Sequence, residues 1–490
     1  MILDYGVMIF FLVAGIFLNM ATWYHPAYFL PVVGFLLICL PIILVKGLNR
    51  PWLVLWLVLL AFFTQDSFPN NVMYETYYGY EAATIYFHNF LGPLSVFDIL
   101  LLSSLYVMTL RHLKAGTIKN LFSGRVEYYV IGIVISLGIV IGLLRNNEMK
   151  NIFAEIQPWV YGLLMYWLVL MTLQDRVAYR RTLLFIVLLL SLTIPLEFLH
   201  YITANYHSLL AVVGRIRKPL LNGTDDTVMV WPVFILLAWV MQQRKQLTPG
   251  RTGIAYFFVL AGLAVIYLNI GRALALFTLM GLVIFFLSQR LNWRIYLIFG
   301  LLGCSLAGLS LFLQPAHLQK LTETFTSVFA ATQDLKKDMS AGDRVVEFFN
   351  VHETLKQKES LGWGLGWGGI WEEYYYQPGR GSLASYADKT LTSHRMTHVI
   401  FSNWTAKCGY LGMILLTLSF LSLWIHFIRT YRQECHPDLK AGLLGMLFAY
   451  PVFLYFSLVF QTGITFVLVI ALMRKAEILS QRPEKGEMDD

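Results

Sequence analysis

Charged residues are scarce in this chain of 490 residues. Only 13% of them are Asp, Glu, Lys or Arg, whereas 57% are hydrophobic and the mean hydropathy is +0.62. A water-soluble protein of this length carries far more charge on its surface, so the composition excludes that class. It predicts an all-α fold instead, a polytopic helical bundle embedded in a membrane.

Cysteine is also rare, with four residues in the chain. Cys39, Cys304 and Cys408 lie within apolar runs, and Cys435 lies in a short polar connection. The longest polar segment, residues 315–397, contains none, which excludes a disulfide framework there. We therefore expect this segment to be ordered by packing on the membrane helices.

Long apolar runs occupy most of the remaining chain. We count about fourteen that can cross a hydrocarbon core of about 30 Å, of which the third and the last are short, and we expect about 12–14 transmembrane helices. The runs cover residues 6–24, 27–45, 51–65, 90–110, 128–144, 158–173, 183–202, 227–242, 252–270, 273–289, 295–314, 398–427, 441–460 and 462–473. The chain thus divides into transmembrane helices over residues 1–314 and 398–473, a loop over residues 315–397 and a tail over residues 474–490.

Lys and Arg gather in alternate connections between the apolar runs. The connection at residues 111–125 is rich in them, for example, whereas that at residues 65–89 has none. Because cytoplasmic connections attract basic residues, both termini are predicted to be cytoplasmic and residues 315–397 to face outward. The formal net charge of +8 follows from this bias, so we infer no nucleic-acid partner from it.

The outward loop contains two recognisable segments. From Asp343, apolar residues spaced as i, i+3, i+4 and i+7 predict a helix along the membrane surface, with Asp343 as its N-cap. The next segment, SLGWGLGWGG at residues 360–369, has too many glycines for a helix and predicts turns. No Lys-Ser or Lys-Thr pair follows, which excludes a phosphate loop. Trp363 and Trp367 could stack on sugars or anchor the loop at the membrane interface.

Arginines in unexpected places indicate an anionic ligand. Arg215 and Arg217 lie in an outward connection, and Arg272 interrupts two apolar runs in LNIGRALALF. A cation at the edge of the hydrocarbon needs an anionic partner, and lipid headgroups can provide it. The other interpretation is a site for a membrane-borne phosphate or diphosphate, which suits the planar guanidinium. Asp98 and Glu197, at the same outward face, could pair with these arginines or act as catalytic carboxylates.

Two histidines close the outward loop in the sequence HRMTH. His394 and His398 have a spacing that occurs in zinc sites, but Arg395 stands where a zinc protease has Glu and no third ligand is evident. We therefore predict no metal. A neutral imidazole at the mouth of a span can act as a general base, because its unperturbed pKa of about 6.5 lies near ambient pH. A structural role for either histidine also stays open.

Three motifs in the C-terminal half resemble those of the O-antigen ligase and polymerase superfamily of bacterial envelope glycosyltransferases. LNIGRALALF is similar to the family's Ser-Arg-Gly element, with Arg272 at the arginine. GDRVVEFF and the following LGWGLG are similar to its Gly-Arg-x-x-x-aromatic and glycine-repeat elements, with Arg344 in place. THVIFSNWTAKCGYLGMIL is similar to its histidine and Gly-x-x-Gly element, with His398 in place.

The resemblance implies a glycosyltransferase of the bacterial inner membrane that needs neither metal nor other cofactor. Members transfer a glycan from a polyprenyl diphosphate carrier to an acceptor glycan or lipid core at the periplasmic face. A chain-length regulator and a flippase are implied as partners besides membrane lipids. Arg272 and Arg344 would stabilise the departing diphosphate, and His398 would be the base. The further residues expected to contact substrate are Arg215, Arg217, His394, Arg395, Trp363 and Trp367.

Several functions stay open at this point. Within the family, the protein could polymerise repeat units of a surface polysaccharide or ligate the finished glycan to lipid A-core or protein. We favour the polymerase, because Val399 replaces the Asn that usually follows the histidine; Lys407 also departs from the family, at a frequently acidic position. A transporter of the same glycan would place polar groups near the bilayer midplane and often show repeated halves, and the sequence indicates neither.

Overall fold

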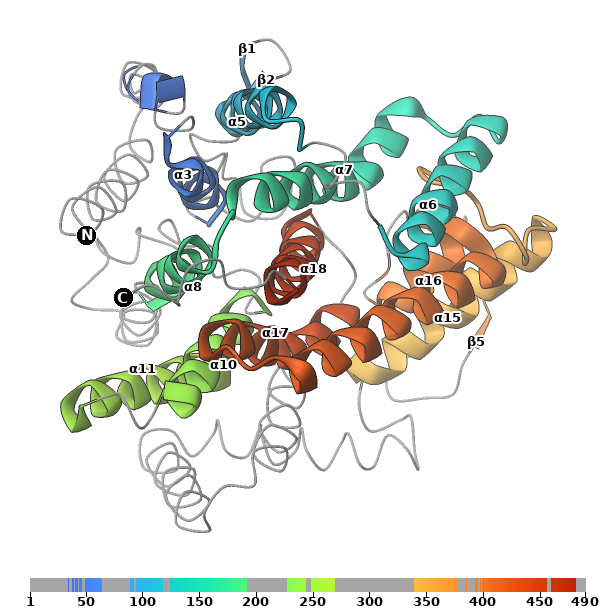
Figure 1. Ribbon diagram of the computed structural model, residues 1–490. Helices are drawn as coiled ribbons and strands as arrows, with labels where there is room; N and C mark the ends of the chain where they lie inside the picture. The colour runs from blue at the N-terminus through green and yellow to red at the C-terminus, as the bar shows by residue number, and fades with distance from the viewer. Residues whose placement is uncertain are drawn as a thin grey trace, which may run out of the picture.

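The computed structural model of the chain describes most of the C-terminal region and several helices before it. The described residues are 49–63, 89–91, 94–117, 124–191, 227–243, 248–268, 339–376, 384–385, 393–394, 397, 399–455 and 460–481, with isolated positions between 34 and 45. Within them the chain is a bundle of α-helices with only very short strands (Figure 1). The all-α prediction is confirmed for these residues.

The helices, in chain order, are α3 (Pro51–Phe63), α5 (Val96–Lys114), α6 (Val126–Leu144), α7 (Met149–Thr172), α8 (Arg176–Ser191), α10 (Thr227–Gln243), α11 (Pro249–Leu268), α15 (Met339–Gln357), α16 (Ile400–Gln433), α17 (Pro437–Tyr455) and α18 (Phe460–Ser480). The strands are β1 (Asn89–Leu91), β2 (Leu94–Ser95), β3 (Trp371–Glu372), β4 (Tyr375–Tyr376), β5 (Ala384–Ser385) and β6 (Ser393–His394). They form three antiparallel pairs, β1 with β2, β3 with β6 and β4 with β5.

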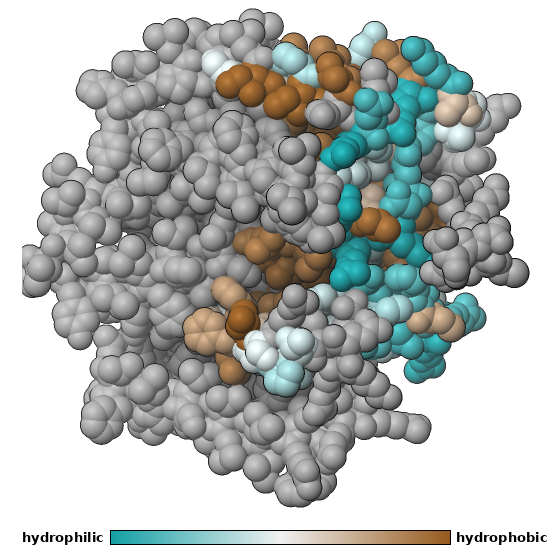
Figure 2. Space-filling view, turned by 60° about the vertical axis from the view of Figure 1, so that its left-hand side comes forward, coloured by the Kyte–Doolittle hydropathy of each residue, from teal (hydrophilic) through white to brown (hydrophobic). Residues whose placement is uncertain are grey.

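Among the described helices, α6, α7 and α16 are each long and apolar enough to cross a membrane. Shorter apolar helical stretches cover Pro51–Phe62, Val233–Gln242 and Thr252–Leu263. Large hydrophobic side chains on α6 and α16 are exposed, as expected for helices that face lipid. On the face drawn in Figure 2, a band of hydrophilic side chains runs beside hydrophobic ones. These features indicate a multi-pass membrane protein.

The centre of the bundle is formed by α18, which lies between α7 and α17 (Figure 1). Aromatic side chains join α16, α17 and α18, with the rings of Phe420 and Phe466 5.1 Å apart and those of Tyr450 and Phe466 also 5.1 Å apart. The hydroxyl of Tyr450 donates to the Phe420 carbonyl at 2.9 Å, so its buried polar group is satisfied. On either side of α16 lie α6 and α15, and these three helices frame the site described below.

Several helix boundaries differ from the sequence predictions, and three helix starts illustrate the reasons. α5 begins at Val96 rather than near residue 90, because the β1–β2 hairpin precedes it. α15 begins at Met339, so Asp343 lies inside the helix rather than at its cap. α7 begins at Met149, well before the apolar run at 158–173, because its first turns carry polar residues with adequate helix propensity. The predicted spans at 6–24, 273–289 and 295–314 lie outside the described residues.

Candidate functional site

The helix α16 is interrupted at Gly409. This residue has φ 69° and ψ −178°, which are not helical values. One helical segment therefore ends before Gly409 and another begins after it. The segment of residues 358–370, here called the Gly-Trp loop, occupies the interruption. A Cβ on Gly409 would lie 2.2 Å from the Gly362 carbonyl oxygen, which explains why only glycine fits.

The loop replaces the hydrogen bonds that α16 loses at this interruption. In an unbroken helix the amides of residues 410 and 411 would donate to the carbonyls of residues 406 and 407. Here these two carbonyls and two amides bond to the loop instead. The carbonyls accept from the loop, Ala406 O from Leu365 N at 2.8 Å and Lys407 O from Gly366 N at 3.0 Å. The amides donate to the loop, Tyr410 N to Leu361 O at 2.9 Å and Leu411 N to Gly362 O at 3.3 Å. The exchange leaves these backbone groups satisfied, so the interruption is stable only while the loop is docked.

The opposite side of the loop packs against α6. Trp367 donates twice to that helix, from its amide to Gly138 O and from its indole Nε1 to Ile135 O, both at 3.1 Å. A Cβ on Gly142 would lie 2.5 Å from the Trp367 carbonyl oxygen, so a glycine is required for this approach. Asn147 lies just after α6, and its side-chain amide donates to the backbone carbonyls of Leu365 and Trp367 at 2.9 Å each. The loop is thus fixed between α6 and α16.

A buried ion pair joins the loop to both α7 and α16. Lys407 Nζ lies 2.7 Å from Glu155 Oε1, and the side chains are 0% and 4% exposed. The same ammonium donates to the Gly369 carbonyl at 2.7 Å, and Glu155 Oε2 accepts the Gly368 amide at 2.7 Å. Two charges that are removed from water in this way are tolerated because each has its counter-charge and further hydrogen bonds.

The helix α15 is attached to the same region. His352 Nδ1 lies 2.9 Å from the Tyr410 hydroxyl, just past the interruption in α16. On its other side, the Asn350 amide pairs with both backbone groups of Tyr375, at 2.9 and 2.6 Å. Thr354 Oγ1 accepts the Glu372 amide at 3.0 Å, which ties α15 to β3. Strand β3 in turn pairs with β6, so α15 and β6 are held in one substructure.

A further polar contact lies at the edge of this substructure. The Tyr374 hydroxyl donates to Glu372 Oε2 at 2.9 Å. Burial, together with the neighbouring carboxylate, raises the pKa of Tyr374 to about 12. Tyr374 therefore stays neutral and keeps this hydrogen bond at ambient pH.

Four of the nine residues that the family resemblance assigns to the site fall within the described part of the chain. Arg344 is half-buried on α15, and His394 lies in β6 opposite Trp371. Trp363 is 58% exposed, whereas Trp367 is 2% exposed and packs in the core. Of these two tryptophans, only Trp363 therefore has a free surface for a ligand, and Trp367 serves to dock the loop.

The other predicted site residues, Arg215, Arg217, Arg272, Arg395 and His398, lie outside the described residues. In the sequence, His398 directly precedes Val399, the N-cap residue of α16. Within the part of the chain that the structure describes, no three His, Cys, Asp or Glu side chains gather as metal ligands would. Asp98, expected as a partner for arginine or as a catalytic acid, accepts a hydrogen bond from the Tyr161 hydroxyl.

Sequence reasoning missed the ion pair of Lys407 and Glu155 as a feature of the site. Both residues had a visible signal, because Lys407 lies inside an apolar run and Glu155 lies three residues before one. A lone charge beside hydrocarbon indicates a partner, but the partner here is 252 residues away and could not be chosen from the pattern.

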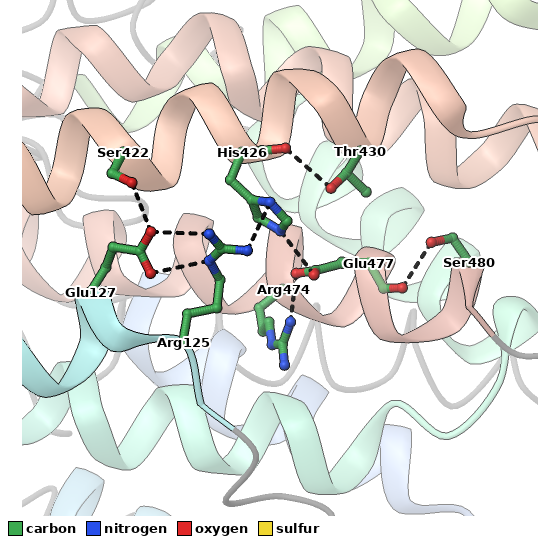
Figure 3. A network of polar contacts seen from close by, with 8 residues as sticks. All are labelled: Arg125, Glu127, Ser422, His426, Thr430, Arg474, Glu477 and Ser480. Atoms are coloured by element: carbon green, nitrogen blue, oxygen red, sulfur yellow. Dashed lines mark hydrogen bonds and ion pairs between the residues drawn. The ribbon is translucent and has the colours of Figure 1, made fainter.

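A second polar network lies at the opposite end of the same helices (Figure 3). We call it the His426 network; its members are Arg125, Glu127, Ser422, His426, Arg474 and Glu477. Arg125 Nη1 lies 2.9 Å from His426 Nδ1, and His426 Nε2 lies 2.9 Å from Glu477 Oε1. Because a guanidinium can only donate, Nδ1 accepts and Nε2 carries the proton that is donated to Glu477. The network joins α6, α16 and α18.

The sidedness of these two polar regions agrees with the distribution of basic residues. The His426 network includes residues beside connections predicted to be cytoplasmic, whereas the Gly-Trp loop meets the α6–α7 turn, which is predicted to face outward.

Comparison with protein-family models finds no match for this chain, and a search of curated proteins finds no significant match either.

Proposed function

We propose that the protein is an inner-membrane glycosyltransferase that transfers a polyprenyl-diphosphate-linked glycan to an acceptor sugar at the periplasmic face. We further propose a repeat-unit polymerase of a surface polysaccharide, with ligation of the finished glycan to a lipid core or protein as the alternative. Both functions would use the same site and the same chemistry, and they differ in the acceptor.

The observation that supports this proposal is that the described elements of the outward segment pack together against the first half of α16. The first described element of this segment is α15, which carries Arg344 and contacts Tyr410 through His352. The last described strand of the segment is β6, which carries His394 and pairs with β3. Arg344 and His394, which are far apart in sequence, thus belong to one substructure, and His398 follows His394 by four residues in the chain. A site for an anionic donor needs its groups held together in this way.

The proposed chemistry needs only these residue types. The acceptor hydroxyl attacks the sugar carbon that is bonded to the diphosphate, the carbon–oxygen bond to the diphosphate breaks, and His398 accepts the hydroxyl proton. Arg344 and Arg272 stabilise the negative charge that grows on the leaving diphosphate. Trp363, whose side chain is exposed on the Gly-Trp loop, offers a face for sugar stacking.

The distribution of charge favours an enzyme over a transporter. In α6, α7 and α16, no Asp, Glu, Lys or Arg lies in the middle third of the helix. The buried pair of Lys407 and Glu155 lies toward one end and the His426 network toward the other. A transporter would be expected to place such groups near the midplane, at the substrate site.

Transfer from a purified lipid-linked donor, without added metal, tests the proposal. We expect Arg344→Ala and His398→Ala to reach the membrane in normal amounts but to lose transfer by a factor of about 100 or more. Arg429→Ala, which removes an exposed arginine at the far end of α16, is the matched control and should retain activity. Wild-type-like transfer by both site variants would refute the proposal.

Deleting the gene separates the two acceptor classes. Loss of a polymerase leaves single repeat units attached to the cell surface, whereas loss of a ligase leaves the acceptor bare. The length distribution of surface glycans on a gel reports which pattern occurs.

A further inference from the structure

We propose that Lys407 and Glu155 are positioning residues that hold the Gly-Trp loop as a re-entrant segment between α6, α7 and α16. Through the loop they determine where α15 and β6 lie. The link to substrate rests on the proposed function, but the docking of the loop can be tested without it.

The loop reaches far into the candidate spans. The backbone amide of Trp367 donates to Gly138 of α6, a helix that ends at Leu144. At a rise of 1.5 Å per residue, Gly138 lies about 9 Å below that end. Non-helical backbone at such a depth is stable in a membrane only if its polar groups are satisfied within the protein.

Most backbone amides of the loop are satisfied by other backbone carbonyls. The amides of Gly364, Leu365, Gly366, Trp367 and Gly369 all donate in this way. Two consecutive residues of the loop bond to buried charged side chains instead. The Gly368 amide donates to Glu155, and the Gly369 carbonyl accepts from Lys407. The ion pair therefore does more than join α7 to α16, because each charge also holds one polar group of the loop.

The loop requires the negative charge at position 155 and the positive charge at position 407. A carboxylate can accept the Gly368 amide but cannot donate to the Gly369 carbonyl, and an ammonium group has the opposite capacity. Exchanging the two charges would preserve attraction between α7 and α16. It would, however, place a carboxylate against a carbonyl oxygen and an ammonium group against an amide N–H.

Undocking of the loop would affect both the elements that the loop connects, α15 and β3, and the helix against which it packs, α16. The loop connects α15 directly to β3, and these elements are joined through Thr354 and Glu372. A Gly-Trp loop that leaves its place would withdraw Leu361 and Gly362 from the interruption in α16. The positions of Arg344 on α15 and His394 on β6 would then no longer be fixed relative to α16.

The experiment measures the accessibility of a buried loop residue. Leu365, which is 2% exposed, is changed to Cys in a background whose four native cysteines are Ala, and labelling by a water-soluble maleimide is timed in lipid nanodiscs. The variants are Lys407→Met, Glu155→Gln and the exchange Lys407→Glu with Glu155→Lys. Lys358→Met is the matched control, because Lys358 also donates to a loop carbonyl, that of Ile370, but is exposed. Ala441→Cys, at a fully buried position on α17, reports unfolding of the whole bundle.

We expect Lys407→Met to accelerate labelling at position 365 by a factor of about 100, because a buried charge that loses its partner is strongly destabilising. The charge exchange should accelerate it similarly, and Lys358→Met should change it by less than about threefold. Slow labelling in the exchanged variant would overturn the inference, since the pair would then only join two helices. Equal acceleration at positions 365 and 441 would also overturn it, because the effect would be global.

Glycan transfer is measured on the same preparations and separates the two proposals. Fast labelling of Lys407→Met with unchanged turnover would refute the positioning role. If the wild-type protein transfers no glycan while the labelling pattern is as expected, only the proposed function fails.

Discussion

The two ends of α16 carry charged groups of quite different character. At one end, Lys407 and Glu155 are almost completely buried and bind the backbone of a loop. At the other end, the His426 network joins side chains to side chains, and Arg125 is 33% exposed. The buried pair is shielded from water, whereas water and neighbouring members can compensate for losses in the network. Burial, rather than the number of contacts, should therefore decide how much each region contributes to stability.

The largest effect is expected where the loop backbone meets a helix backbone. Gly366→Ala places a Cβ 2.2 Å from the Gly142 amide nitrogen, at a residue whose φ is +75°. Neither backbone can move without loss of hydrogen bonds, so we expect destabilisation by about 4 kcal/mol or more. The thermal unfolding midpoint in detergent measures this. Gly362→Ala is the control, because no atom lies within 4 Å of the added Cβ; equal midpoints for the two variants would contradict the close approach.

The next effect separates a buried carboxylate on α7 from an exposed one at the N-cap of the same helix. Glu155→Ala removes the carboxylate that pairs with the buried Lys407, and we expect a loss of about 3–5 kcal/mol. Glu148→Ala, just before α7, removes only an exposed hydrogen bond to Asn151 and should cost less than about 1 kcal/mol. Both are compared by unfolding in mixed micelles. Similar losses would show that the burial of Glu155 does not govern its contribution.

The smallest of these effects is expected in the His426 network. His426→Ala removes the bridge between Arg125 and Glu477, but Arg125 keeps Glu127 and Glu477 keeps Arg474. We therefore expect a loss of about 1–2 kcal/mol in the same unfolding assay. Ser480→Ala, which removes a hydrogen bond within α18, should change stability by less than about 0.5 kcal/mol. A loss in His426→Ala that equals that of Glu155→Ala would remove the contrast between the two ends.

Much of the helical layout was predictable from local pattern. The apolar runs at 128–144 and 398–427 correspond to α6 and α16, and the amphipathic pattern after Asp343 corresponds to α15. These predictions succeeded because apolar length and the helical period depend only on neighbouring residues. The start of α7 was misplaced because polar residues in its first turns face the loop and the α6–α7 turn, which a hydropathy pattern does not reveal.

The candidate site was predictable only in part. The glycines of the Gly-Trp loop indicated turns, but their reason is the approach of three backbones, those of the loop, α6 and α16. The exposed Trp363 and the buried Trp367 occur in the same repeated Gly-Trp sequence, so nothing local distinguishes them. Arg344 and His394 were candidates from sequence, but their membership of one substructure depends on Tyr410, Glu372 and Trp371, which lie on other elements.

Sequence by itself determined that this is a helical membrane protein with a polar, glycine-rich segment between two apolar parts. Hydrophobic length and the placement of Lys and Arg are sufficient for this, because they reflect the bilayer as a solvent rather than any partner in the chain. Tertiary structure alone decided that the segment enters the bundle and that Lys407 pairs with Glu155. Backbone groups that are removed from water must find partners wherever the fold brings them, and sequence separation places no limit on that choice.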